Sequence, residues 1–237
     1  MHRTQSDFDI NALFSFKDVS PKTQQHLRKV YTLLTFMTLF CATGAYLNAS
    51  FVIAQNFLFH ILSIGFSIYL MCYVSNIYKP EENRKYALAL LAFQLGFNIG
   101  PALHQIAQFQ PEILIKAVGF TATAFISFTC MALFSKRRSL LFLGGIGMTM
   151  FQGMMFYRFF GFLTGMGGQG LVYLMIMLFV DCCFLIYHTQ MIIEKSERNM
   201  ADVPTDTMNL FLELFKLFVR ILRILLELSE KKDKKKR

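Results

Sequence analysis

The chain has 237 residues, of which 54% are hydrophobic, 15% aromatic and only 16% charged. Soluble globular domains carry about a quarter charged residues, so this composition excludes an ordinary water-soluble enzyme and a disordered chain. The formal net charge is +9, and basic residues are crowded into positions 231–237. This local charge favours anionic lipid or an acidic partner near that end over nucleic acid.

Six apolar runs follow one another along the chain, each about as long as the 20 residues that a helix needs to cross a bilayer. The predicted spans are 30–50, 54–77, 86–107, 113–135, 139–160 and 170–193. Lys and Arg number 5, 0, 3, 1, 3, 1 and 2 in and beside the successive connections, where the two single residues, Lys116 and Arg158, lie just inside the ends of their spans. Because basic residues remain on the cytosolic side, the alternation places the N-terminus and the end of the sixth span in the cytosol. We therefore divide the chain into a cytosolic segment 1–29, a transmembrane domain 30–228 and a basic cytosolic tail 229–237.

Small residues and a histidine recur every four positions in the third predicted span, and a proline interrupts them: Ala92, Gly96, Gly100, Pro101 and His104. Small residues at this spacing let two helices approach closely, and proline leaves a backbone carbonyl without its helical donor. The pattern predicts a packing face with a kink. A broken helix that lines a conduction path, with His104 on its face, is the alternative.

Ionisable side chains are costly inside a membrane, so each one within a span is a candidate functional residue. Asp181 lies near the middle of the sixth span, and His188 follows seven residues later on the same helical face. A carboxylate and an imidazole so placed can share a proton or an ion, and Glu213 is a third candidate for that pocket. A hydrogen-bonded structural role is the alternative for Asp181. No catalytic or metal-binding motif occurs, so we expect neither an enzyme nor a bound cofactor or metal.

The segment 207–228 is apolar but carries a polar stripe with helical spacing, formed by Asn209, Glu213, Lys216, Arg220, Arg223 and Glu227. A full crossing would carry the basic tail to the far side of the membrane, against the charge rule. We therefore predict a re-entrant helix that turns its stripe toward the other helices and returns the tail to the cytosol. A peripheral helix in the membrane interface is the alternative. The predicted fold is an all-α membrane protein, a six-helix transmembrane bundle plus this C-terminal amphipathic seventh helix.

Four strings of sequence resemble the transmembrane Bax inhibitor motif family, namely 21–31, 96–103, 137–145 and 189–195. The resemblance extends from about residue 10 to the lysine-rich tail. It implies a multi-pass protein of the endoplasmic-reticulum membrane that suppresses apoptosis and lowers luminal calcium through a pH-sensitive leak. The charge rule places both termini in the cytosol. The resemblance also implies links to the unfolded-protein response, through stress sensors, and to anti-apoptotic Bcl proteins. A homo-oligomer is a candidate assembly, and the tail residues are candidates for binding lipid or a partner: Lys231, Lys232, Lys234, Lys235, Lys236 and Arg237.

Members of that family are similar in having a pair of aspartates that gates the pore, and His188 and Glu213 stand at those places here. Two nearby carboxylates share one proton, whereas a histidine and a glutamate can form an ion pair. Imidazole is also a poor ligand for calcium, which prefers oxygen. Two functions are left open: a calcium leak with an altered response to acid, in which calcium is the permeant ion, and a non-conducting scaffold that binds death regulators through its tail.

Overall fold

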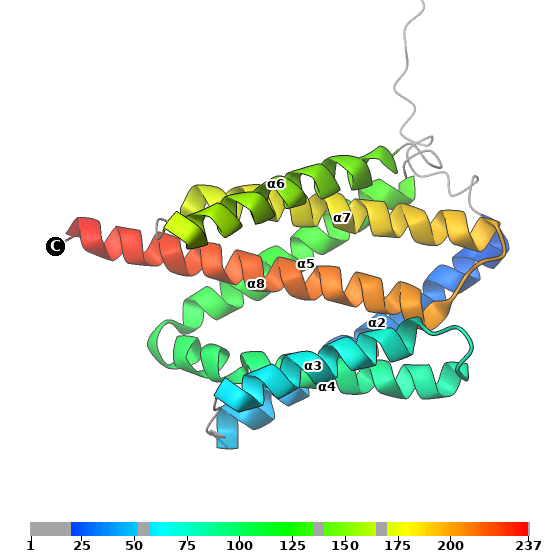
Figure 1. Ribbon diagram of the computed structural model, residues 1–237, viewed down its shortest axis with the longest axis horizontal. Coiled ribbons are helices and arrows are strands. Elements are labelled where there is room, and N and C mark those ends of the chain that lie inside the picture. Colours follow the sequence, from blue (N-terminus) through cyan, green and yellow to red (C-terminus); the bar gives the residue numbers. More distant parts are fainter. Residues whose placement is uncertain (1–19, 52–56, 135–139, 165–169, 237) are drawn as a thin grey trace, which may run out of the picture.

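The computed structural model describes residues 20–51, 57–134, 140–164 and 170–236 (Figure 1). These ranges contain seven helices and no strand, so the predicted all-α class is confirmed. The helices are α2 Pro21–Phe51, α3 Phe57–Ser75, α4 Glu81–Phe109, α5 Pro111–Phe134, α6 Phe142–Thr164, α7 Leu171–Glu197 and α8 Val203–Lys236.

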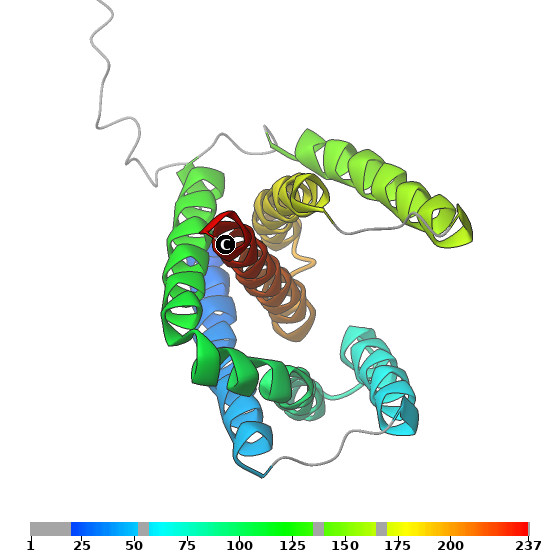
Figure 2. The same ribbon diagram turned by 90° about the vertical axis from the view of Figure 1, so that its left-hand side faces the viewer.

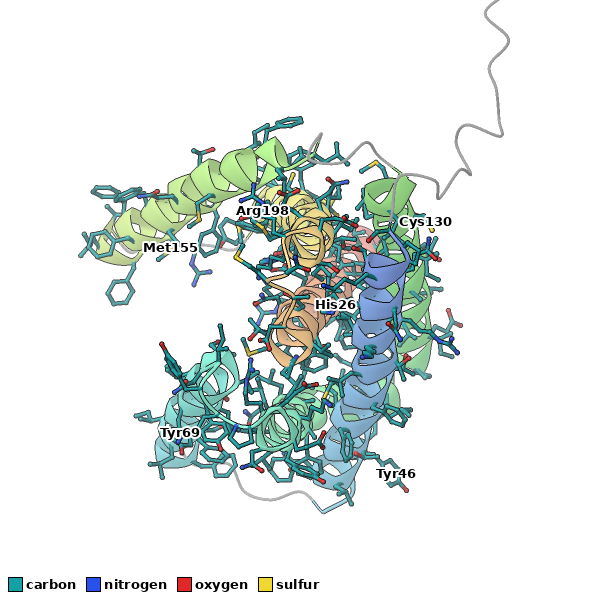
Figure 3. All side chains as sticks on the ribbon, turned by 90° about the vertical axis from the view of Figure 1, so that its right-hand side faces the viewer. His26, Tyr46, Tyr69, Cys130, Met155 and Arg198 are labelled. Atoms are coloured by element: carbon teal, nitrogen blue, oxygen red, sulfur yellow. The ribbon has the colours of Figure 1, made fainter. Side chains whose placement is uncertain are left out.

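Four of these helices, α2, α4, α5 and α7, are long and apolar enough to cross a membrane. The other two predicted spans correspond to α6 and to α3, whose apolar part, Ile61–Ser75, is shorter. Large side chains face outward from the helices: Tyr46 on α2 is 72% exposed and Tyr69 on α3 is 59% exposed (Figure 3). Apolar surface exposed on this scale requires lipid as the surrounding solvent. The chain is a multi-pass membrane protein.

The helix α2 begins at Pro21, earlier than the predicted start of the first span at residue 30. Proline suits the first helical position because its φ is fixed and its missing N–H would have no helical partner there. Ser20 caps the helix, since its Oγ accepts a hydrogen bond of 3.3 Å from the backbone N–H of Thr23. The first turns of α2 therefore belong to the helical bundle. Residues 1–19 lie outside the described ranges.

The helices α2 and α4 pack most extensively, along the small-residue face predicted in the third span. Gly96 lies against the backbone of Cys41, and Gly100 lies against that of Ala45. Pro101 leaves the carbonyl of Phe97 without its helical donor, and Asn48 Nδ2 of α2 donates a hydrogen bond of 2.5 Å to that oxygen. The helix continues unbroken to Phe109, so the structure has the packed arrangement and not the broken helix.

The helix α8 lies inside an arc of helices and contacts α2, α3, α4, α5 and α7 (Figure 2). Its apolar residues enter two clusters of buried side chains: Leu210 and Phe211 pack with α2, α4 and α7, and Leu217 and Leu222 pack with α5. The alternative of a peripheral helix in the membrane interface is therefore wrong, because α8 is packed inside the bundle.

The structure also differs from the re-entrant path, because α8 is continuous over 34 residues and does not turn back. At 1.5 Å per residue it is about 51 Å long, enough to cross a bilayer. It starts beside Ser20, near the end of α7, and finishes at the opposite end of the bundle (Figure 1). Burial of its apolar faces on several helices at once holds it straight. The side chains of Lys234, Lys235 and Lys236, and the whole of Arg237, lie outside the described part of the chain.

We expect the two termini to lie on opposite sides of the membrane, because α8 is unbroken. In sealed microsomes, protease should remove an N-terminal tag and leave a C-terminal tag intact until detergent is added. Removal of both tags without detergent would contradict the continuous crossing and restore the path that the charge rule predicts.

The replacement Gly96→Ala should destabilise the protein by about 1–3 kcal/mol, because the added Cβ would collide with the backbone carbonyl of Cys41 and force α2 and α4 apart. Gly119→Ala on α5 is the control, since a Cβ there meets nothing within 4 Å. Thermal unfolding of both variants in one detergent makes the comparison. Equal unfolding temperatures would show that close packing at Gly96 adds nothing.

Candidate functional site

A tight turn at residues 198–202 sets α7 and α8 antiparallel. Asn199 adopts the left-handed conformation, with φ of 61°. The backbone N–H of Met200 donates to the carbonyl of Lys195 at 2.9 Å, and that of Asn199 donates to Ser196 at 3.1 Å. This is the Schellman arrangement, which satisfies the last carbonyls of a helix. The turn fixes which residues of α7 and α8 face one another.

Three ion pairs form a ladder between the two helices, and successive rungs are seven positions apart on each helix. The first rung is Lys195 with Asp206, at 3.3 Å. The second is His188 with Glu213, at 3.4 Å, and this contact is an ion pair when the imidazole is protonated. The third is Asp181 with Arg220, at 3.0 Å. A repeat of seven keeps the rungs on one seam of the helix pair, about 10 Å apart.

The structure thus brings His188 and Glu213 into contact and places Asp181 one rung away, with Arg220 as its partner. Sequence reasoning placed Arg220 on the polar stripe but did not pair it. The pairing of Arg220 can be read from the sequence once α7 and α8 are known to be antiparallel. In two antiparallel helices, the residue numbers of facing partners have the same sum in every rung.

The middle rung contains a further cation that sequence reasoning did not assign. Lys216 Nζ lies 2.7 Å from Glu213 Oε1, and it also lies over the ring of Phe184, 5.6 Å from its centroid. Glu213 Oε2 is buried and has no hydrogen-bond partner among the described residues. The glutamate therefore faces two basic groups and keeps one carboxylate oxygen available. This oxygen can accept a proton or a further hydrogen bond.

Other predicted residues lie outside the ladder. His104 on α4 is hydrogen-bonded to Gln108 at 2.8 Å. In the tail, Lys231 pairs with Glu227 at 3.1 Å, and Lys232 is exposed. Within the described ranges, no group of three His, Cys, Asp or Glu side chains could hold a metal ion.

A second polar cluster ties the α7–α8 turn to α2, α3 and α4, and sequence reasoning missed it. Arg84 of α4 is buried and donates to the carbonyl of Val74 at 2.6 Å, to Thr205 Oγ1 at 2.9 Å and to both carboxylate oxygens of Asp202. Asp202 also caps α8, where its carboxylate accepts the N–H of Thr205 at 3.3 Å. The sequence signal for this cluster is the aspartate directly before the start of α8. Arg84 is one of the three basic residues counted between the second and third predicted spans, and that count gives it no partner.

The same cluster anchors the start of α2. His26 of α2 lies 2.9 Å from Asp206 of α8, and both are buried (Figure 3). Ser20 and Thr23 hydroxyls donate to Glu197 Oε1 at 2.7 and 2.6 Å. Three helices therefore meet at the first rung of the ladder, which fixes where α8 enters the bundle.

The electrostatics of Asp202 favour its ionised form. Burial alone would raise the pKa of this carboxyl, but the hydrogen bonds from Arg84 and Thr205 and the charge of Arg84 together hold the pKa below its ordinary value. The carboxylate and the guanidinium thus remain paired throughout the physiological pH range.

Comparison with known proteins places the chain among relatives of similar length. The family described as "Inhibitor of apoptosis-promoting Bax1" matches residues 23–230. A Bos taurus protein named Bax inhibitor 1 is 36% identical over 230 residues, 97% of each chain. The Homo sapiens protein of that name is 34% identical over 96% of this chain and 95% of its own. The Arabidopsis thaliana protein is 32% identical over 94% and 89%.

The replacement Asp202→Asn should cost about 2–3 kcal/mol at neutral pH, because it removes the charged partner of Arg84. The pKa of Asp202 is lower in the folded state, so its contribution is complete above the ordinary value of about 3.9 and is lost as pH falls below it. Thermal unfolding from pH 7 to pH 3 should show the wild type losing an increment that the variant lacks. Glu82→Gln, on the exposed start of α4, is the control. Parallel pH curves for wild type and Asp202→Asn would contradict the assignment.

Proposed function

The chain belongs to the family of inhibitors of apoptosis-promoting Bax1, and on that premise we propose that it acts in the endoplasmic-reticulum membrane, where it suppresses apoptosis and modulates luminal calcium. The proposed activity is a pH-sensitive calcium leak linked to the unfolded-protein response. Its proposed partners are membrane lipids, anti-apoptotic Bcl proteins and stress sensors, with no nucleic acid. Assembly with further copies of the chain belongs to the same proposal.

The contact of His188 with Glu213 is the observation that carries this proposal. It lies at the centre of the bundle, between α7 and the helix that the other helices surround. Imidazole is the side chain that changes charge between pH 5 and 8, so a proton there alters the attraction between α7 and α8. The pair therefore supplies a pH-dependent contact at the place where a conduction path would have to open.

The surrounding charges set the expected direction of the response. Glu213 already faces Lys216, and the next rung contributes Asp181 and Arg220. Protonation of His188 adds a second cation beside Glu213, which strengthens the contact and closes α8 against α7. Acid should therefore close this path, whereas a pair of aspartates that shares one proton would lose this charge-assisted hydrogen bond when acid adds a second proton.

The replacement His188→Asp should convert the leak into one that acid stimulates, most fully when it is combined with Glu213→Asp. The two sites are in contact, so the single changes should not add. Calcium efflux from liposomes at pH 6 and pH 7.5, for wild type, both single variants and the double variant, measures this. We expect the wild type to leak less at pH 6 than at pH 7.5 and the double variant to leak more, each by several-fold.

The control is Lys116→Gln, which changes an exposed cation on α5 whose partner is Glu112. It should reproduce the wild-type response. A wild type that leaks more on acidification, with no change in any of the three variants, would remove the pair of His188 and Glu213 from the mechanism.

A non-conducting scaffold is the second candidate, and the charge balance of the ladder favours it. Each carboxylate in the three rungs has a basic partner, whereas calcium requires six to eight oxygen ligands. Such a protein would bind death regulators through its tail. Purified protein that releases no calcium at either pH, but still protects cells from apoptosis when expressed, would favour the scaffold.

A further inference from the structure

A groove of about 570 Å³ lies between α6, α7 and α8, away from the middle rung of the ladder. Its lining is unusual for a membrane bundle because it combines apolar side chains with three arginines. The arginines are Arg158 of α6 and Arg220 and Arg223 of α8. The apolar part of the lining includes Phe151, Met155 and Phe159. None of the described side chains that line the groove is a carboxylate.

The arginines differ in how they are neutralised. Arg220 is paired with Asp181 at 3.0 Å. Arg158 forms no ion pair within the described residues, and its guanidinium lies over the ring of Tyr173, 5.7 Å from the centroid. A cation on the lipid-facing surface of a membrane protein has an unfavourable free energy unless an anion or water compensates it. Arg158 therefore contributes a positive charge to the groove that no acidic side chain of the described residues balances.

The position of the groove matches the geometry of a lipid molecule. Arg158 lies six residues before the end of α6, about 9 Å along the helix, and Tyr173 is near the start of α7. Both helix ends lie at the end of the bundle opposite Ser20 (Figure 1). Phe151 lies about two turns farther from that end of α6 than Arg158 does, and is therefore closer to the bilayer midplane. Arg158 is therefore closer to the membrane surface than the apolar side chains of Phe151 and Met155.

We propose that this groove binds an anionic phospholipid of the surrounding bilayer, with its phosphate between Arg158 and Arg223 and one acyl chain against the Phe and Met side chains of α6. Arginine recognises phosphate oxygens through several parallel N–H donors, and the phenylalanines supply the apolar contact. The lipid would also fill the space beside α6, which packs chiefly against α7.

The chain contains no tryptophan, so a single introduced indole reports on its own position. Phe159→Trp places it in the groove, and Ile61→Trp is the matched control. Phe159 is 58% exposed and Ile61 is 50% exposed, and each lies within a few residues of a helix end at the same end of the bundle. The full chain is reconstituted in bilayers that contain either brominated phosphatidylserine or brominated phosphatidylcholine, and quenching of the indole is measured.

Phosphatidylserine should quench the indole at position 159 more strongly than phosphatidylcholine does, and the two lipids should quench equally at position 61. Each arginine should contribute about five-fold to the preference, from roughly 1 kcal/mol per basic residue near the surface. Arg158→Gln combined with Arg223→Gln should abolish the preference at position 159. Arg158→Lys should retain part of it, and Lys79→Gln, a cation outside the groove, should leave it unchanged.

Equal preference at positions 159 and 61 would overturn the proposal, because attraction of anionic lipid by the basic tail alone would act on both reporters. A preference at position 159 that survives loss of both arginines would overturn it as well. Neither result bears on calcium flux, so this test is independent of the proposed leak.

Discussion

The need to compensate charge inside a lipid environment governs this structure. A charged side chain at the centre of a membrane helix costs about 2.5–3.5 kcal/mol, so the four charges from Glu213 to Arg223 would cost about 10–14 kcal/mol in an isolated α8. In the bundle, Glu213, Lys216 and Arg220 have partners within 3.4 Å. The apolar faces of the same helix pack on α2, α5 and α7. The helix is stable because it is surrounded.

The order of charges along the ladder also fixes the register of α8. The first two rungs have the basic group on α7 and the acid on α8, whereas the third has the acid on α7. A slip by seven residues, which would keep the apolar faces aligned, would set Asp181 opposite Glu213 in one direction or Glu227 in the other. Like charges repel at such distances, so only one register satisfies every rung.

The sequence predicted the parts of this arrangement that depend on local pattern. Hydrophobic runs located the helices, the stripe on 207–228 gave the polar face of α8, and the seven-residue spacing put Asp181 and His188 on one face. Contacts between distant segments were missed, because no periodicity links Arg84 to Asp202 or His26 to Asp206. The direction of α8 differed from expectation for a related reason: basic residues count in the charge rule, but packing on several helices does not.

The polar character of α8 has a consequence for how the protein is made. A translocon releases a helix into lipid according to its own hydrophobicity, and α8 is too charged to be released on that basis. Five described residues that pair with it across the bundle precede it in the chain and are synthesised first: His26, Arg84, Asp181, His188 and Lys195. Insertion of α8 is thus an assembly step, in which a preformed ring of helices accepts a segment that the bilayer alone would reject.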